Sequence, residues 1–358
     1  MKSNFQPRCL PLLIGSMPVK EHDHAAQLAF KYTPDIPLWV QLPYYAQEGM
    51  VAQFVPGLPG VVHKDERIYI DTSAESFDAD LLAFFEEYMA VMEGQSSLET
   101  SRFALTPKSA PGFFALERQL PNVSSPSMAV KGQVTGPITF CTGLADQDRR
   151  AIFYNDTVRD AAVKHLALKA AWQVRRLSQF NLPVIIFIDE PALAGFGSSE
   201  FISITKEDIF ACLKEVIDAV HNEGGLAGIH VCANTDWSLA LDSEVDIVNF
   251  DAFGYFDRFV LYPDAIKRFL DRGSILAWGI VPTLKAEEIE AASTESLVKR
   301  LHQYFHQLEN IGLEKKAILA QSLITPSCGV GSLSFELAIK VMELTCEVSK
   351  TLRAEIQS

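Results

Sequence analysis

Several features that mark specialised classes of protein are missing from this sequence. No apolar run is long enough to cross a membrane as a helix. Prolines interrupt the apolar patch near the start, and no signal-peptide core follows it. Acidic residues outnumber basic ones by 45 to 31, which gives a net charge of −14, and no basic cluster stands out. Because nucleic-acid binding depends on neutralising phosphates with Lys and Arg, we expect a cytoplasmic protein with neither a nucleic-acid nor a membrane partner.

Cysteine is sparse and irregularly spaced, and a glycine-rich nucleotide loop is missing. A cytosolic chain keeps its thiols reduced, so a special cysteine is expected to bind a metal or to act in catalysis. A doubly wound dinucleotide-binding fold would carry its glycine-rich loop after an early strand, and the lack of one disfavours that fold. The six cysteines are Cys9, Cys141, Cys212, Cys232, Cys328 and Cys346.

What the sequence does contain is an alternation of short apolar runs and helical patterns along its 358 residues. Continuous apolar runs are typical of parallel strands covered on both faces, and eight of them separated by helices favour a (β/α)8 TIM barrel. We predict a single α/β barrel domain over residues 1–358, with an insertion at about 44–127 between strands two and three. The predicted strands cover residues 9–16, 38–42, 128–134, 184–188, 226–231, 246–250, 275–279 and 317–321, and an aromatic loop is expected at 253–262.

The fifth predicted strand leads into a His-x-Cys pair. Residues two apart in a strand point to the same side, so His230 and Cys232 can be directed at one point in space. An imidazole and a thiolate are half of a tetrahedral zinc site. Cys328, in the turn ITPSCGVG, and Asp251 follow other strands at the same end of the barrel. The alternatives are a small hydrophobic packing role for a cysteine and a helix cap for Asp251.

Two other strand ends carry residues suited to binding a ligand. Asp189 and Glu190 follow the apolar strand VIIFI, where two carboxylates are costly to bury unless they are paired. Alternatively, one of them caps the next helix and the other forms a salt bridge. The Ile-Gly-Ser at 14–16 allows close backbone approach by a ligand, or else forms an ordinary turn. In TIM barrels the active site is built from loops that follow the strands, which places all these residues at one end.

Five short motifs together resemble the catalytic barrel of cobalamin-independent methionine synthase. The wider superfamily includes uroporphyrinogen decarboxylase and the zinc methyltransferases that use methylated corrinoids. The resemblance covers nearly the whole chain, and the motifs follow the family's order, although each alone is unspecific. They are IGS at 14–16, GPIT at 136–139, IDEPA at 188–192, HVC at 230–232 and PSCG at 326–329.

The resemblance implies a bound Zn2+ and the transfer of a methyl group to a small thiol such as homocysteine. Asp251 stands where the family has a glutamate ligand and is one methylene shorter, which suits a weak ligand that leaves as the substrate arrives. Asp251 and Asp189 are therefore the implied catalytic carboxylates. The implied metal ligands are His230, Cys232, Cys328 and Asp251. The implied acceptor-binding residues are Ile14, Gly15 and Ser16 for the carboxylate and Asp189, with Glu190 beside it, for the amino group.

Three positions depart from the family pattern. Ala52 replaces a glutamate that helps to hold the amino group. Gly143 replaces the tryptophan that stacks on the pterin of folate, and Leu284 replaces the proton-donating histidine. The last two changes both affect the folate side, so the resemblance favours methylcobalamin or a methylated corrinoid protein over methyltetrahydrofolate as the methyl donor.

Two other functions stay open from the sequence. A decarboxylase of the uroporphyrinogen type needs no metal but requires arginines near the strand ends to hold carboxylates. The arginines nearest to the early strand loops are Arg8 and Arg67, which is few for that chemistry. A non-catalytic subunit that binds zinc or a corrinoid protein would also keep the metal ligands, but the retained IDEPA and IGS motifs favour catalysis.

Overall fold

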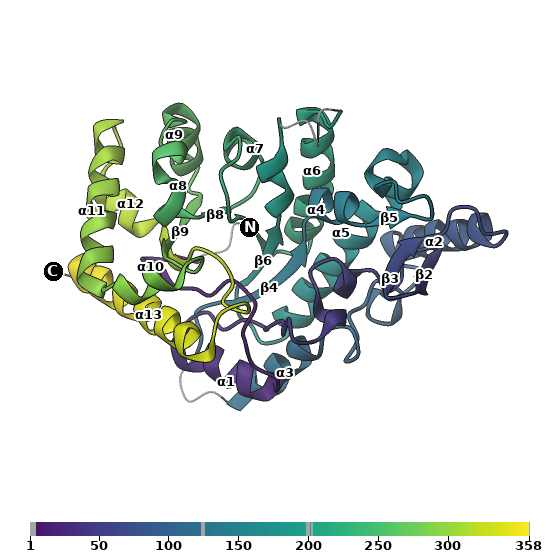
Figure 1. Ribbon diagram of the computed structural model, residues 1–358, viewed down its shortest axis with the longest axis horizontal. Coiled ribbons are helices and arrows are strands. Elements are labelled where there is room, and N and C mark those ends of the chain that lie inside the picture. The colour runs from purple at the N-terminus through teal and green to yellow at the C-terminus, as the bar shows by residue number, and fades with distance from the viewer. Residues whose placement is uncertain (1–4, 123–125, 198–200, 202, 358) are drawn as a thin grey trace.

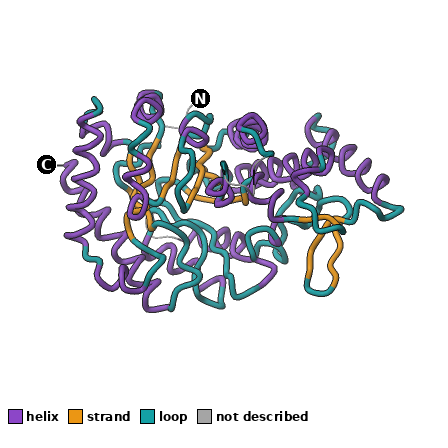
Figure 2. The backbone as a smooth tube through the Cα atoms, turned by 45° about the horizontal axis from the view of Figure 1, so that its top comes forward, coloured by secondary structure: helices purple, strands orange, loops and turns teal. Residues whose placement is uncertain are grey.

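The computed structural model describes residues 5–122, 126–197, 201 and 203–357. Its centre is a curved sheet of seven parallel strands in the order β1-β10-β9-β8-β7-β6-β4, with helices around its outer side (Figures 1 and 2). The fold is therefore α/β and parallel, as predicted. The strands are β1 (Leu10–Pro11), β4 (Val130–Thr135), β6 (Val184–Asp189), β7 (Leu226–Val231), β8 (Ile247–Phe250), β9 (Ile275–Val281) and β10 (Ser322–Pro326).

The strand register decides which side chains share the concave face of the sheet. A small apolar core on that face is contributed by residues from β1, β6, β8, β9 and β10, among them Leu10, Ile185, Phe187, Ile247, Ile275, Ala277 and Leu323. Side chains alternate along a strand, so the next inward positions on β6 and β8 are Asp189 and Asn249. His230 of β7 pairs in register with both. The concave face is thus apolar at depth and polar toward the carboxyl ends of the strands.

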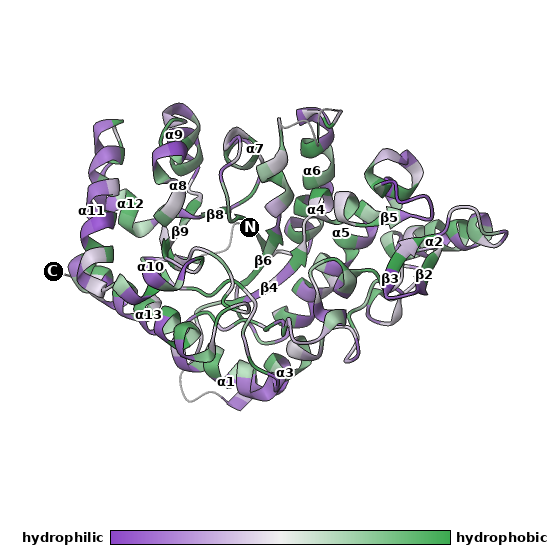
Figure 3. Cartoon of the chain, viewed as in Figure 1, coloured by the Kyte–Doolittle hydropathy of each residue, from purple (hydrophilic) through white to green (hydrophobic). Residues whose placement is uncertain are grey.

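The larger hydrophobic core lies between the sheet and the surrounding helices, whose surfaces are partly hydrophobic and partly hydrophilic (Figure 3). In α11, for example, Leu297, Leu301, Phe305 and Leu308 recur at helical spacing and are all buried. Within the described residues, no helix is long and apolar enough to span a membrane. The helices around the sheet are α1 (His22–Tyr32), α4 (Pro137–Gly143), α5 (Asp156–Ser178), α6 (Lys206–Asn222), α7 (Ser238–Leu241), α8 (Ala252–Phe259), α9 (Pro263–Asp271), α10 (Ala286–Ala291), α11 (Thr294–Asn310), α12 (Lys315–Ala320) and α13 (Phe335–Gln357).

The predicted insertion at 44–127 adds a hairpin and one helix to one side of the molecule, together with a second helix that packs against α1 (Figure 1). Asp65 and Glu66 connect the two hairpin strands with positive φ angles of 49° and 61°, the backbone geometry that two-residue hairpin turns require. The hairpin pairs with a short strand outside the insertion to form a second sheet of three strands. These elements are β2 (Val61–Lys64), β3 (Arg67–Ile70), α2 (Phe77–Met92), α3 (Pro111–Gln119) and β5 (Ala145–Asp146).

The predicted closed barrel of eight strands is not observed, because residues 38–42 do not form a strand. Instead, Leu38 makes an isolated bridge to Lys131 of β4, and Gln41 makes one to Ser16, which follows β1. Prolines at positions 37 and 43 flank the segment, and proline has no N–H to donate to a ladder. The segment therefore connects the two edges of the seven-stranded sheet at separate points without completing it.

Three other predicted elements are wrong in part. Residues 317–321 fall mainly in helix α12, and the last strand, β10, begins only at Ser322. Periodicity alone cannot distinguish a short apolar run in a strand from one in a buried helix. The aromatic segment 253–262, predicted as a loop, largely belongs to α8. The first strand, predicted over 9–16, is reduced to Leu10–Pro11.

Candidate metal centre

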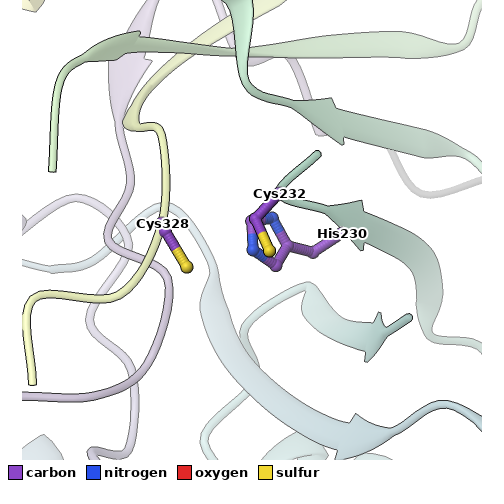
Figure 4. A group of neighbouring side chains, drawn as sticks. All are labelled: His230, Cys232 and Cys328. Atoms are coloured by element: carbon purple, nitrogen blue, oxygen red, sulfur yellow. The ribbon is translucent and has the colours of Figure 1, made fainter. Parts of the chain in front are cut away.

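Three of the predicted ligands meet at the carboxyl end of the sheet. His230 lies in β7, Cys232 follows that strand, and Cys328 lies in the turn after β10. Their candidate ligand atoms are all within 4.8 Å of one another, and Figure 4 shows the sulfur of Cys328 directed toward the other two side chains. The predicted convergence of these three residues, distant in the sequence, is therefore confirmed.

The imidazole of His230 is buried and held in one orientation by Asn249. Nδ1 of His230 is hydrogen-bonded to Oδ1 of Asn249. The Asn249 amide donates to the Ala277 carbonyl at 2.9 Å and to Oγ1 of Thr325 at 2.8 Å, so its oxygen faces His230 as an acceptor. Nδ1 must then carry the proton, which leaves a lone pair on Nε2. That atom is buried and has no hydrogen-bond partner among the described residues, as expected of a metal ligand.

Cys232 and Cys328 form a closely coupled pair of thiols. The pKa of Cys232 is lowered, first by the neighbouring Cys328 thiol, whose hydrogen bond favours the thiolate, and then by the adjacent imidazole of His230, while burial opposes the shift. The pKa of Cys328 is raised, first because its thiol is hydrogen-bonded to the Cys232 sulfur, and further by burial and by the negative charge of Cys232. Both side chains are half-buried. The pair is therefore suited to holding one thiolate and one thiol. A cation placed between the two sulfurs would favour ionisation of the second thiol as well.

Asp251 lies outside the group of three converging side chains. Its carboxylate accepts a hydrogen bond of 2.7 Å from the Gly254 N–H and caps helix α8, so the cap considered as an alternative is present. Burial raises the pKa of Asp251 to about 6, although the Gly254 hydrogen bond opposes the shift. The carboxylate is therefore committed to the helix, and coordination of a metal by Asp251 stays a prediction.

Asp189 and Glu190 are neighbours in sequence but have different environments. Glu190 is fully buried and accepts hydrogen bonds from the N–H groups of Ile138 and Thr139, both at 2.8 Å, and from Oγ1 of Thr139 at 2.7 Å. Burial raises its pKa to about 7 against these hydrogen bonds. Gly136 lies so close to this carboxylate that a Cβ there would collide with it. The assignment of Glu190 to the substrate is thus corrected: it caps α4, not the helix that follows it.

Asp189, by contrast, points to the concave face and keeps an open acceptor. Its Oδ1 atom is buried and has no hydrogen-bond partner in the described part of the chain. The pKa of Asp189 is raised by burial, while the charges of Lys131 and His230 oppose the shift. The salt bridge considered for one of the two carboxylates is not formed by either within the described residues. An acceptor that is buried and unpaired in this way is suited to a donor on a ligand.

The Ile14–Ser16 loop lies next to Cys328. Ile14, Gly15 and Ser16 line one small cavity together with Cys328. Oγ of Ser16 accepts a hydrogen bond of 3.2 Å from the Gly331 N–H, in the turn that carries Cys328. The structure therefore brings the predicted carboxylate-binding loop next to Cys328, one of the three converging residues.

Sequence reasoning missed two polar residues on the same face, Asn249 and Lys131. Lys131 is fully buried, and its ammonium donates to the Ile14 carbonyl and, at 3.1 Å, to Oε1 of Gln133. Burial lowers the pKa of Lys131 to about 8, although the charge of Asp189 opposes the shift. A usable signal was present, because lysine and asparagine are unusual inside strands that are otherwise buried on both faces.

A cavity of about 1050 Å³ lies between the β2–β3 hairpin and the loops around residues 46–56, 106–109 and 143–144. Two of the positions that depart from the family pattern, Ala52 and Gly143, line it. Lys64, Arg67 and Lys108 also line it. The third departing position, Leu284, is 81% exposed. The small residues at 52 and 143 therefore leave space open beside the insertion.

Comparison with known proteins does not assign this chain to a family. No family model matches it, and no curated protein matches it. Similar solved structures include a Xaa-Pro dipeptidase with bound methionine in its active site, which is 12% identical over 69% of this chain and 62% of that chain, with a TM-score of 0.32. A β-glycosidase from the hyperthermophile Thermosphaera aggregans is 11% identical over 93% and 87% of the two chains, with a TM-score of 0.35. The ochratoxinase of A. niger is 10% identical over 84% and 69%, with a TM-score of 0.28. Similarities this low carry no argument about function.

Proposed function

We propose that the protein is a zinc-dependent methyltransferase that transfers a methyl group to a small thiol. One observation carries the proposal. The two sulfurs of Cys232 and Cys328 lie close to the imidazole of His230, whose Nε2 atom has no hydrogen-bond partner within the described residues. One nitrogen and two sulfurs form a donor set that Zn2+ prefers, and three protein ligands leave the fourth position to a substrate, as in catalytic zinc sites. The sequence resemblance to methionine synthase supports the same reading.

A zinc ion bound there would supply a Lewis acid that deprotonates a coordinating thiol at neutral pH. This matters because the thiolate, and not the thiol, is the nucleophile in sulfur alkylation. The residues of the chain prepare the site: Asn249 fixes the imidazole of His230, while Cys232 and Cys328 provide negative charge that keeps an acceptor sulfur electron-rich. Asp251 remains the candidate for a weak fourth ligand, and coordination would require it to release the Gly254 N–H.

The acceptor side is formed by the Ile14–Ser16 loop and Asp189. The loop adjoins Cys328. Oδ1 of Asp189, which has no hydrogen-bond partner among the described residues, lies on the inner face beside the register position of His230. A thiol that also carries a carboxylate and an amino group, such as homocysteine, would satisfy both. We also infer that the sheet is an open variant of the (β/α)8 barrel, because the segment 38–41 is bridged to both of its edges.

Replacing Asn249 with alanine is expected to weaken zinc binding by roughly 10–100-fold, the usual effect of removing the partner that orients a metal-binding histidine. The reason is that His230 would lose the acceptor that fixes its tautomer. The affinity is measured by competition with a chromophoric chelator. Asn249→Asp is the matched control, since it keeps an oxygen acceptor for Nδ1 and should retain most of the affinity. Wild-type affinity in Asn249→Ala would contradict the role given to Asn249.

The methyl donor is tested with zinc-loaded protein, methylcobalamin and methyltetrahydrofolate as donors, and homocysteine and coenzyme M as acceptors. We expect transfer from methylcobalamin, and transfer from the folate slower by roughly 10²–10⁴-fold, because Leu284 cannot act as the general acid that a folate donor needs. Product formation is followed by mass spectrometry. Equal rates with the two donors would refute the donor assignment, whereas no transfer with any pair would refute the proposed function.

A further inference from the structure

Lys131 is a fully buried cation on the concave face of the sheet. It pairs in register with Ile185 of β6, and its side chain extends from there along the inner face, with its ammonium 4.6 Å from the centre of the Phe187 ring. The ammonium therefore lies closer to the carboxyl ends of the strands than its own backbone does. It is directed toward the layer that holds Asp189 and His230.

Burying an ammonium is unfavourable unless hydrogen bonds and an opposite charge compensate it. Two of the three N–H groups of Lys131 are satisfied by the Ile14 carbonyl and by Gln133. The compensating charge comes from Asp189, whose carboxylate raises the pKa of Lys131 against the effect of burial. Lys131 therefore acts on Asp189 through its charge, while Oδ1 of Asp189 stays without a hydrogen-bond partner among the described residues.

The same ammonium also holds the Ile14–Ser16 loop. Its bond to the Ile14 carbonyl fixes the peptide unit that precedes Gly15. Gly15 packs against the amides of Gln133 and Gln41, since a Cβ there would lie 3.4 Å from each. One buried lysine therefore contacts the loop and balances the carboxylate that the proposed function assigns to the acceptor.

We propose that Lys131 is a positioning residue for the acceptor side of the site: it holds the Ile14 carbonyl and balances Asp189, so that the open carboxylate oxygen is presented to the amino group of an amino-thiol acceptor. This inference rests on the proposed function. The competing explanation is structural. Lys131 lies where the segment 38–41 bridges the sheet edges, and it would then serve only to join them.

The two explanations differ in what replacement of Lys131 does to ligand discrimination. Binding of homocysteine and of 4-mercaptobutyrate, which lacks the amino group, is measured by calorimetry on zinc-loaded protein. Wild-type protein is expected to prefer homocysteine by at least about tenfold, the value of one charge-assisted hydrogen bond. Lys131→Met and Asp189→Asn should each reduce this preference to near one, and the double variant should show no further loss. Lys131→Arg should restore part of it.

Lys169→Met provides the matched control. Lys169 is also buried, with its pKa lowered to about 7 by burial, but it lies on α5, one turn from Gln173, which packs against Gly132 on the opposite face of β4. Its replacement should leave the preference for homocysteine unchanged. If the double variant Lys131→Met/Asp189→Asn melts at a higher temperature than Lys131→Met alone, the two charges are coupled as stated, even where the single variant folds poorly.

Four outcomes overturn the inference. A wild-type preference that persists in Lys131→Met, or an equal loss in Lys169→Met, leaves Lys131 with a structural role only. Equal binding of the two thiols by the wild-type protein removes amino-group recognition while the proposed function stands. Failure of the zinc-loaded protein to bind either thiol would refute both the inference and the proposed function.

Discussion

If the proposed function is right, replacing Cys328 with serine is expected to release zinc from the purified protein and to abolish methyl transfer. A four-ligand zinc site binds with roughly 10–16 kcal/mol, so the loss of one thiolate costs roughly 3–4 kcal/mol, or a factor of about 100 to 1000 in affinity. Serine cannot replace the thiolate, because its hydroxyl stays protonated at neutral pH. Metal content per chain is measured by plasma mass spectrometry, and activity is measured with methylcobalamin and homocysteine. Cys232→Ser should behave in the same way.

The chain offers a control for this experiment. Cys346 is also half-buried, on α13, but it is not part of the converging group, so Cys346→Ser should keep its zinc and its activity. The fold should survive in all three variants, since Cys232 and Cys328 lie in turns beyond the strand ends. A Cys328→Ser protein that holds one equivalent of zinc at wild-type affinity would show that the sulfur is not a ligand.

The convergence of the three ligands could be predicted because it depends on simple geometry. The spacing of His230 and Cys232 is two residues, which in a strand gives one direction for both side chains. The strand itself, β7 at Leu226–Val231, was predicted with the same bounds. Cys328 follows another parallel strand, and the carboxyl ends of parallel strands lie at one end of the sheet. These inferences need no knowledge of the packing.

The elements that were mispredicted depend on contacts that are not local. Residues 38–42 read as an apolar strand, but their neighbours are Ser16 on one side and Lys131 on the other, each reached by one bridge only. The short apolar run at 317–321 is compatible with a buried helix as well as with a strand, and periodicity cannot distinguish the two. Its packing against the sheet decides that it is mainly helical. The prediction of a closed barrel counted both segments as strands. The prolines around residues 38–42 and the tertiary packing of residues 317–321 prevent these segments from pairing along their full length.

The roles of Asn249, Lys131 and Glu190 were hidden for a related reason. Each is a polar residue whose function depends on a partner more than 15 positions away in the sequence. Glu190 was assigned to the substrate because it follows Asp189, yet adjacent residues at a strand end point to opposite sides. One carboxylate therefore faces the site and the other faces helix α4. The sequence alone identifies the two carboxylates, but it does not show which of them is available to a ligand.

Replacing Glu190 with alanine is accordingly expected to lower the free energy of unfolding by roughly 3–5 kcal/mol, because two buried N–H groups of α4 would lose their acceptor at about 1–3 kcal/mol each and a cavity would form. Glu190→Gln keeps one acceptor oxygen and should lose less. Both variants are measured by urea denaturation of the metal-free protein.

Asp189→Asn should lose less stability than Glu190→Ala, since Oδ1 of Asp189 has no hydrogen bond to break among the described residues. It should, however, lose the preference for an amino thiol. If Glu190→Ala unfolds at the wild-type midpoint while Asp189→Asn is strongly destabilised, the two carboxylates have been assigned the wrong way round.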